Sequence, residues 1–259
     1  MADHTPETTR APRRKQASTI KALSNVLLDA GTLLPAEVLL APPVERLNAP
    51  DRAIDYRIAP AHSHAAAFEA TTLTGVLIFG SSRRPGGGWE NGAKAQEEDI
   101  SLVSTWAVQA GASEGFYKEG SLAGPDLVLV ADGAWLMDPQ GALLDPPRPV
   151  VFAGVAAPNR AAPEVAALPS VHQQALLARR LLGALDAWES RGVDTLVLGA
   201  IGCGVFQWPA EESAQALRRA LSASSWRGEL ILAMPDPTLA QVFSKVLSAP
   251  PQVKPRPSP

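Results

Sequence analysis

Three consecutive glycines followed at short distance by two adjacent glutamates are the residues of this sequence best suited to chemistry. Glycine has no Cβ, so a run of glycines lets a sugar or a phosphate approach the backbone closely. A glutamate beside such a surface can donate or accept a proton. The segment RRPGGGWENGAKAQEED, residues 83–99, carries these groups in the order Gly86, Gly87, Gly88, Gln96, Glu97 and Glu98.

Each half of this pattern also has a purely structural explanation. A lone glycine run is often a flexible turn, and acidic residues in a first helical turn interact favourably with the helix dipole. On that interpretation, replacing Asp99 by Asn would cost a few tenths to about 1 kcal/mol. Consecutive helical residues diverge by about 100°, so we expect Glu97 and Glu98 to point in different directions and to do different work.

A second glycine-rich loop follows another apolar strand in the segment LVLGAIGCGVFQWP, residues 196–209. A strand, a glycine turn and a helix N-terminus together favour anion binding, although the segment is neither a Walker A nor a GxGxxG motif. Phe206 suits either a core position or a platform for a sugar or base, and Cys203 has no histidine nearby in the sequence to support a role as nucleophile. The candidate binding residues of this loop are Gly202, Cys203, Gly204, Val205 and Phe206.

Composition excludes several classes of protein. The chain has 259 residues, of which 46% are hydrophobic and 19% charged, with a formal net charge of -3; it is neither disordered nor basic enough to coat nucleic acid. A single cysteine excludes an internal disulfide and a cysteine-based zinc site, and we expect no metal or other cofactor. Without a long apolar run or a signal-peptide pattern, we expect a cytoplasmic protein.

The elements that must position the two loops alternate along the chain. This alternation predicts one α/β domain with a largely parallel or mixed central sheet. We expect strands over 37–42, 52–60, 74–80, 126–132, 148–157, 194–202 and 228–235. We expect helices over 16–31, 95–111, 170–192, 209–224 and 237–249. The predicted boundaries are a disordered tail at 1–14, the domain at 15–248 and a proline-rich tail at 249–259, with the basic cluster at 13–15 as a solvated helix start.

The order and spacing of the two loops resemble those of the bacterial-type poly(ADP-ribose) glycohydrolases. The GGG-to-QEE signature is highly specific, GCGVF is similar to the diphosphate loop of that family, and the resemblance runs from about Lys15 to about Leu247. It implies a three-layer α/β/α macrodomain with a mixed central sheet. One position departs from the family pattern: Arg84 stands where an asparagine usually precedes Pro-Gly-Gly-Gly, and an arginine there could reach a phosphate or point to solvent.

The resemblance also implies a role for each candidate residue. Glu98 matches the catalytic acid, Glu97 matches the neighbour that holds ribose hydroxyls and positions the scissile bond, and Gln96 matches a supporting residue. The glycines of the first loop match the surface that packs on the distal ribose and diphosphate. In the second loop, residues 202–204 match the backbone that wraps the diphosphate, and Phe206 matches the aromatic near the distal ribose.

The implied reaction fits these residues chemically. Hydrolysis of a ribose–ribose O-glycosidic bond passes through an oxocarbenium-like centre and a leaving oxygen that needs a proton. A carboxylic acid in a partly desolvated cleft can supply it, which is worth about 10²–10⁴-fold in rate. We hypothesise that Glu98 acts as acid and then as base towards water, and that the diphosphate of the substrate helps to orient that water.

Two alternatives to a polymer hydrolase stay open: a non-catalytic ADP-ribose reader and a mono-ADP-ribosyl hydrolase. The expected partners are poly(ADP-ribose) or ADP-ribose and poly(ADP-ribosyl)ated proteins, which would place the protein in the DNA damage response. We expect a monomer, with no membrane association and no sequence-specific binding of nucleic acid.

Overall fold

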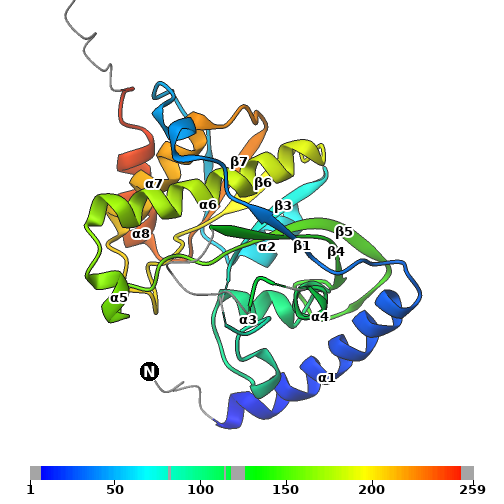
Figure 1. Ribbon diagram of the computed structural model, residues 1–259. Coiled ribbons are helices and arrows are strands. Elements are labelled where there is room, and N and C mark those ends of the chain that lie inside the picture. The colour runs from blue at the N-terminus through cyan, green and yellow to red at the C-terminus, as the bar shows by residue number, and fades with distance from the viewer. Residues whose placement is uncertain (1–6, 81–82, 114, 118–125, 252–259) are drawn as a thin grey trace, which may run out of the picture.

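The computed structural model describes residues 7–80, 83–113, 115–117 and 126–251 (Figure 1). Its centre is a seven-stranded mixed sheet in the order β1-β4-β5-β3-β6-β7-β2. Pairing is antiparallel between β1, β4 and β5 and parallel from β5 across to β2. The strands are β1 (Glu37–Leu40), β2 (Arg57–Ala59), β3 (Thr74–Phe79), β4 (Leu127–Met137), β5 (Leu143–Val155), β6 (Thr195–Leu198) and β7 (Glu229–Ala233).

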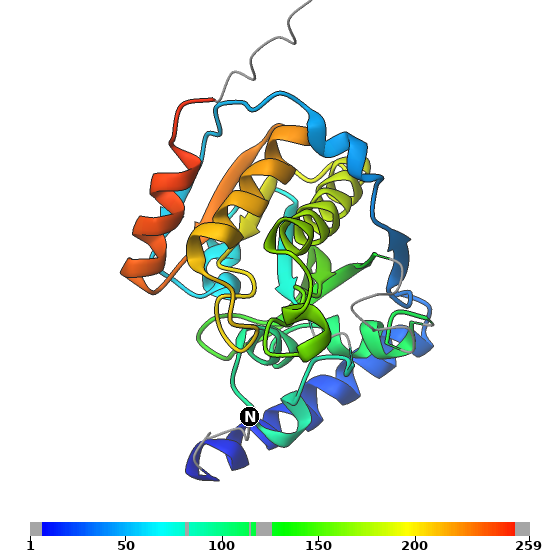
Figure 2. The same ribbon diagram turned by 60° about the vertical axis from the view of Figure 1, so that its left-hand side comes forward.

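Helices cover both faces of this sheet, giving three layers (Figures 1 and 2). One face carries α1 (Glu7–Asp29), α2 (Ser63–Glu69), α3 (Gln96–Ser101) and α4 (Trp106–Ala112). The other carries α6 (Ser170–Ser190), α7 (Ala210–Ala223) and α8 (Pro237–Leu247). The shorter elements are α5 (Pro163–Ala166) and the 3-10 helices η1 (Val44–Asn48) and η2 (Trp89–Asn91).

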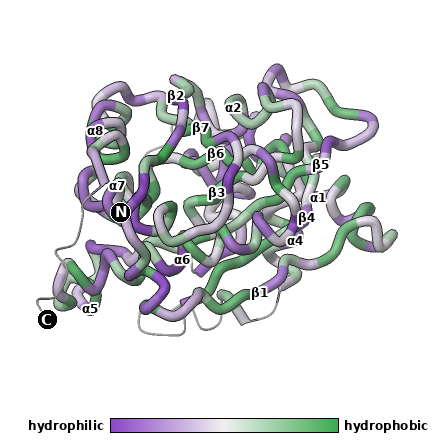
Figure 3. Tube along the Cα trace, turned by 90° about the horizontal axis from the view of Figure 1, so that it is seen from above, coloured by the Kyte–Doolittle hydropathy of each residue, from purple (hydrophilic) through white to green (hydrophobic). Residues whose placement is uncertain are grey.

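Two hydrophobic cores lie on opposite faces of the sheet because side chains alternate along each strand. In β3, Val76 and Ile78 pack into the core beneath α1–α4, whereas Leu77 packs into the core beneath α6–α8. This strand is buried on both faces, which explains why its sequence is continuously apolar. In Figure 3 hydrophobic residues run through the central strands, with hydrophilic residues more frequent in the surrounding loops.

The predicted helix over 95–111 is wrong in one respect, because the structure divides it into α3 and α4. The intervening residues pair with β4: Ser104 forms an isolated bridge with Trp135, and the N–H of Leu136 donates to the carbonyl of Val103 at 2.8 Å. The Ser104 hydroxyl also donates to the carbonyl of Ile100. This long-range pairing ends α3 after six residues and sets its direction separately from that of α4.

The other predicted strands and helices are present, with shifted ends. β4 and β5 extend into a long antiparallel pair, and α2 was not expected. α1 begins at Glu7, so residues 7–14 are helical rather than part of a tail; residues 1–6 and 252–259 of the two predicted tails lie outside the described residues. No helix in the described part of the chain is long and apolar enough to cross a membrane.

Candidate active site

The first glycine loop is held by the two glutamates of α3. Gly86 and Gly87 adopt positive φ angles of 66° and 61°, a conformation that side chains other than glycine rarely adopt. The N–H of Gly86 donates to Glu97 Oε1 at 3.1 Å, and the N–H of Gly88 donates to Glu98 Oε1 at 2.9 Å. The start of α3 therefore fixes the shape of the loop through two hydrogen bonds.

Gly87 lies between these bonds and faces both carboxylates. A Cβ at Gly87 would lie 2.3 Å from Glu98 Oε1 and 3.6 Å from Glu97 Oε2. The carboxylates of two helical residues that point in different directions therefore both reach this loop, because the loop bends around the helix start. The surroundings of the two side chains differ, since Glu97 is buried and Glu98 is half-buried.

Glu97 belongs to the interior of the domain. Only 4% of its surface is exposed, and Trp106 Nε1 donates to the same Oε1 atom that Gly86 contacts, at 3.3 Å. Burial raises the pKa of the nearby Tyr117 hydroxyl, and the negative charge of Glu97 raises it further. Glu97 is thus a buried side chain, fixed by hydrogen bonds, that joins the glycine loop to α4.

Gln96 ties the start of α3 to the end of β3. Its Oε1 accepts from the N–H of Phe79 at 3.0 Å, and its Nε2 donates to the carbonyl of Leu77 at 2.6 Å and to Ser63 Oγ at 3.2 Å. The N-cap residue, Ala95, has no polar side chain. The position of α3 therefore depends on these long-range bonds rather than on a local cap.

The second loop presents backbone donors. Gly202 has a φ of 79°, and a Cβ there would lie 2.7 Å from the Trp208 ring. Within the described chain, the N–H groups of Gly204, Val205 and Phe206 have no hydrogen-bond partner. Consecutive free N–H groups before the N-terminus of α7 suit an anion such as a diphosphate.

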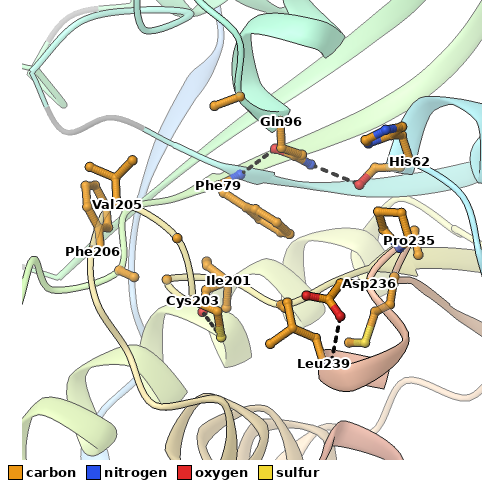
Figure 4. Close-up of a pocket in the computed structure, with 18 residues that line it drawn as sticks. His62, Phe79, Gln96, Ile201, Cys203, Val205, Phe206, Pro235, Asp236 and Leu239 are labelled. Atoms are coloured by element: carbon orange, nitrogen blue, oxygen red, sulfur yellow. Dashed lines mark hydrogen bonds between the residues drawn. The ribbon is translucent and has the colours of Figure 1, made fainter. Parts of the chain in front are cut away.

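A cavity of about 350 Å³ lies between the second loop and Gln96 (Figure 4). All five predicted residues of the second loop line it, and Phe79 projects into it between Gln96 and Asp236. Gly86, Gly87, Gly88, Glu97 and Glu98 are not among its lining residues. Glu97 and Glu98 directly follow the lining residue Gln96, and they bind the first loop through Gly86 and Gly88.

The other walls of this cavity come from residues outside the two sequence motifs. Phe79 is the last residue of β3 and Asp236 follows β7, and the rule that ligands bind beyond the carboxyl ends of strands could have pointed to both. Asp236 Oδ1 accepts from the N–H groups of Thr238 and Leu239, capping α8. Nothing in the sequence pattern marks His62, which comes from the segment before α2.

Cys203 lies on the cavity wall with a protonated thiol. Burial raises its pKa, and a hydrogen bond with Ser213 offsets this only in part. A nucleophilic cysteine needs a lowered pKa, so the thiol is a wall rather than a nucleophile. Among the residues that the structure describes, no group of three or more His, Cys, Asp and Glu side chains could hold a metal ion.

The second loop is braced from behind by a charged network. The guanidinium of Arg160 lies 4.0 Å from the centre of the Trp208 ring. The backbone N–H of Arg160 donates to the carbonyl of Phe206 at 3.1 Å. Its Nη2 donates to Glu212 Oε2 at 2.5 Å. Hydrogen bonds from Arg160, and then from Ser170 and Gln174, lower the pKa of Glu212 to about 2, against the opposing effect of burial.

Comparison with known proteins agrees with this geometry. Residues 9–123 match the family model of the microbial-type PARG catalytic domain, PARG being poly(ADP-ribose) glycohydrolase. The fold is similar to that of poly(ADP-ribose) glycohydrolase from Thermomonospora curvata bound to the inhibitor ADP-HPD, with 23% identity and a TM-score of 0.72 over 91% of this chain and 99% of that chain. It is also similar to the enzyme from Deinococcus radiodurans in complex with ADP-ribose, with 25% identity and a TM-score of 0.65 over 82% and 94% of the two chains. No curated protein matches the sequence. The family resemblance and the α/β/α macrodomain fold predicted from the sequence are confirmed.

Proposed function

We propose that this chain, whose residues 9–123 match the catalytic domain of microbial-type PARG, is a glycoside hydrolase that releases ADP-ribose from poly(ADP-ribose). The observation that carries the proposal is the pair of carboxylates that meet at Gly87, next to a cavity lined by free N–H groups. The ADP-ribose complex of the D. radiodurans enzyme supports the same ligand here.

The terminal ADP-ribose unit of the polymer binds across the two loops. Its diphosphate accepts hydrogen bonds from the N–H groups of Gly204, Val205 and Phe206, and its distal ribose lies against Gly87. Any side chain at Gly87 would enter the space next to Glu98. The bare glycine is therefore what allows the sugar to reach the carboxylates.

Glu98 acts first as an acid and then as a base. Its Oε1 is occupied by the N–H of Gly88, so the proton moves through Oε2. As the bond between the anomeric carbon and the leaving ribose oxygen breaks, Oε2 gives its proton to that oxygen. Water then adds to the oxocarbenium-like carbon and returns a proton to Oε2, which restores the acid.

Glu97 has a positioning role next to this chemistry. It is buried and shares Oε1 between Gly86 and Trp106, so its carboxylate is fixed before substrate arrives. A fixed anion near the ribose can orient hydroxyl groups and stabilise a developing positive charge on the sugar. A single acid–base residue suits this geometry, because both carboxylates approach the loop from α3, whereas ordinary glycosidases place two on opposite sides of the bond.

A Glu98→Gln variant tests the proposal directly. The amide keeps an acceptor for the N–H of Gly88 but cannot donate and retrieve the proton, so we expect release of ADP-ribose to fall by about 10²–10⁴-fold. Calorimetry should show nearly unchanged affinity for ADP-ribose. Glu90→Gln, at an exposed glutamate of η2, is the matched control and should keep full activity.

The outcomes separate the alternatives. A wild-type protein that binds ADP-ribose but releases none from any substrate would be a reader. Release from mono-modified but not polymer substrates would indicate a mono-ADP-ribosyl hydrolase, and normal turnover by Glu98→Gln would refute the mechanism. The roles of individual site residues, a cytoplasmic location, a part in the DNA damage response and a monomeric state remain predictions.

A further inference from the structure

The N-terminal helix, α1, binds α3 and the segment between the first loop and α3 through hydrogen bonds and an ion pair. In Figures 1 and 2, α1 runs along the lower edge of the molecule, beside η2 and α4. The guanidinium of Arg13 donates to the carbonyl of Ala93 from Nε at 3.1 Å and from Nη2 at 2.7 Å, and Nη2 forms an ion pair with Asp99 at 2.8 Å. Both side chains are 18% exposed, so the expected solvated helix start is wrong for Arg13.

These contacts belong to a closed series of hydrogen bonds and one ion pair that includes the hydrogen bond between Gly88 and Glu98. Arg13 binds the carbonyl of Ala93, and the N–H of Ala93 donates to the carbonyl of Gly88 at 3.2 Å. The N–H of Gly88 donates to Glu98. Asp99, the next residue of α3, forms the ion pair with Arg13 that closes the series. One guanidinium thus fixes the loop on one side of the Gly88–Glu98 bond and the helix on the other.

The helix needs such a support. α3 has six residues, whereas an isolated helix shorter than about 12–15 residues is marginal in water. Its N-cap is Ala95, which offers no side-chain bond. Asp99 therefore does more than interact with the helix dipole, and the sequence-based estimate for its replacement by Asn leaves out the ion pair.

α1 is shaped to lie close to this loop. Gly92 has a φ of 77°, and a Cβ there would lie 2.9 Å from the backbone of Arg10. Further along the helix, Gln16 Nε2 donates to the carbonyl of Leu102 at 3.0 Å. α1 therefore contacts the connection before α3 and the residue directly after it.

We propose that Arg13 is a positioning residue that sets the orientation of Glu98 through Ala93 and Asp99. This inference rests on the proposed function. Arg13 lies on the side of the first loop and makes none of the bonds that brace the second loop. Because the diphosphate binds at the second loop, we expect the loss of Arg13 to act mainly on the chemical step and to leave the affinity for ADP-ribose nearly unchanged.

The test compares variants of the full chain by kcat and KM for release of ADP-ribose from polymer, and by the Kd for ADP-ribose. We expect Arg13→Ala to lower kcat by about tenfold to a hundredfold, since a 1 Å misplacement can cost about 10²-fold, with the Kd unchanged. Arg13→Lys keeps the positive charge and should recover part of this loss. Recovery should be incomplete, because an ammonium lacks the planar fork that bonds two acceptors at fixed geometry. Lys21→Ala is the control: it removes a cation of the same helix whose pair with Glu90 is 51% exposed on both sides, and it should keep the wild-type kcat.

The kcat and Kd of Arg13→Ala, measured beside the wild type, distinguish a failure of this inference from a failure of the proposed function. Wild-type kcat in Arg13→Ala beside an active wild type would overturn this inference alone, and so would an equal weakening of ADP-ribose binding. If Arg13→Ala does not fold, Arg13→Lys and Asp99→Asn decide, since both must then show lowered kcat at unchanged Kd. A wild-type protein that releases no ADP-ribose would refute the proposed function and this inference with it.

Discussion

Replacing Gly87 by alanine should separate the cost of backbone strain from the cost of moving the catalytic carboxylate. The residue has a φ of 61°, and its Cβ would lie 2.3 Å from Glu98 Oε1, where contacts under 3.0 Å force a shift. Strain at a left-handed position costs about 1–2 kcal/mol. The carboxylate must also retreat by roughly 1 Å, a displacement that can cost about 10²-fold in rate.

Gly192, which directly follows α6 and its C-cap residue, provides the matched control. Its φ is 66°, and nothing lies within 4 Å of a Cβ placed there. Gly192→Ala should therefore carry the same strain as Gly87→Ala without any contact with the site. At about 2–4 °C of Tm for each kcal/mol in a domain of this size, both variants should melt a few degrees below wild type.

The assay measures initial rates of ADP-ribose release at saturating polymer, beside a thermal melt of each protein. We expect Gly87→Ala to lose about 10²-fold in kcat and Gly192→Ala to keep the wild-type rate. If Gly87→Ala works at the wild-type rate, the position of the Glu98 carboxylate does not limit catalysis. Equal losses in both variants would mean that strain alone explains the effect.

Two further predictions concern the second loop. Phe206 is half-buried at the edge of a core and lines the cavity. Phe206→Ala should therefore weaken ADP-ribose binding measured by calorimetry, and should lower the free energy of unfolding by less than the about 3–5 kcal/mol typical of a buried Phe. A large loss of stability with normal affinity would contradict this. Because the pKa of Glu212 is lowered to about 2, its stabilising effect is complete above its ordinary pKa of 4.5 and is lost as pH falls towards 2. Denaturant melts should therefore show Glu212→Gln less stable than wild type at pH 7, with the difference shrinking at pH 3, and a constant difference at the two pH values would exclude the role of its charge.

The sequence predicts those parts of the fold and site that depend on local pattern. Apolar runs such as the one ending at Phe79 mark strands buried on both faces, and glycine runs mark loops that must expose backbone. The division between α3 and α4 is not predictable in this way, because it arises from pairing of Ser104 with Trp135 in a distant strand. The cavity walls contributed by Phe79 and Asp236 likewise depend on which strand ends become neighbours.

Two separate groups of side chains support the two loops, one around Arg13 and one around Arg160. Neither group can be recognised from the sequence pattern. A basic run on a polar helix is typical of a solvated surface, and only the docking of α1 shows that Arg13 reaches Ala93 and Asp99. Arg160 is equally unremarkable in sequence, yet it braces the second loop through Trp208 and Glu212.

The two supports share no residue, which makes their effects separable. Disturbing the Arg13 support moves the carboxylate that transfers the proton, so kcat should fall while ADP-ribose binds normally. Disturbing the Arg160 support moves the N–H groups that receive the diphosphate, so affinity should fall first. Mutations at distant sites without shared partners combine additively in free energy, within about 0.3–0.5 kcal/mol. A double variant at Arg13 and Arg160 should therefore show the product of the two single losses in kcat/KM, as expected of a site in which one loop holds the diphosphate and the other is held to the acid–base residue.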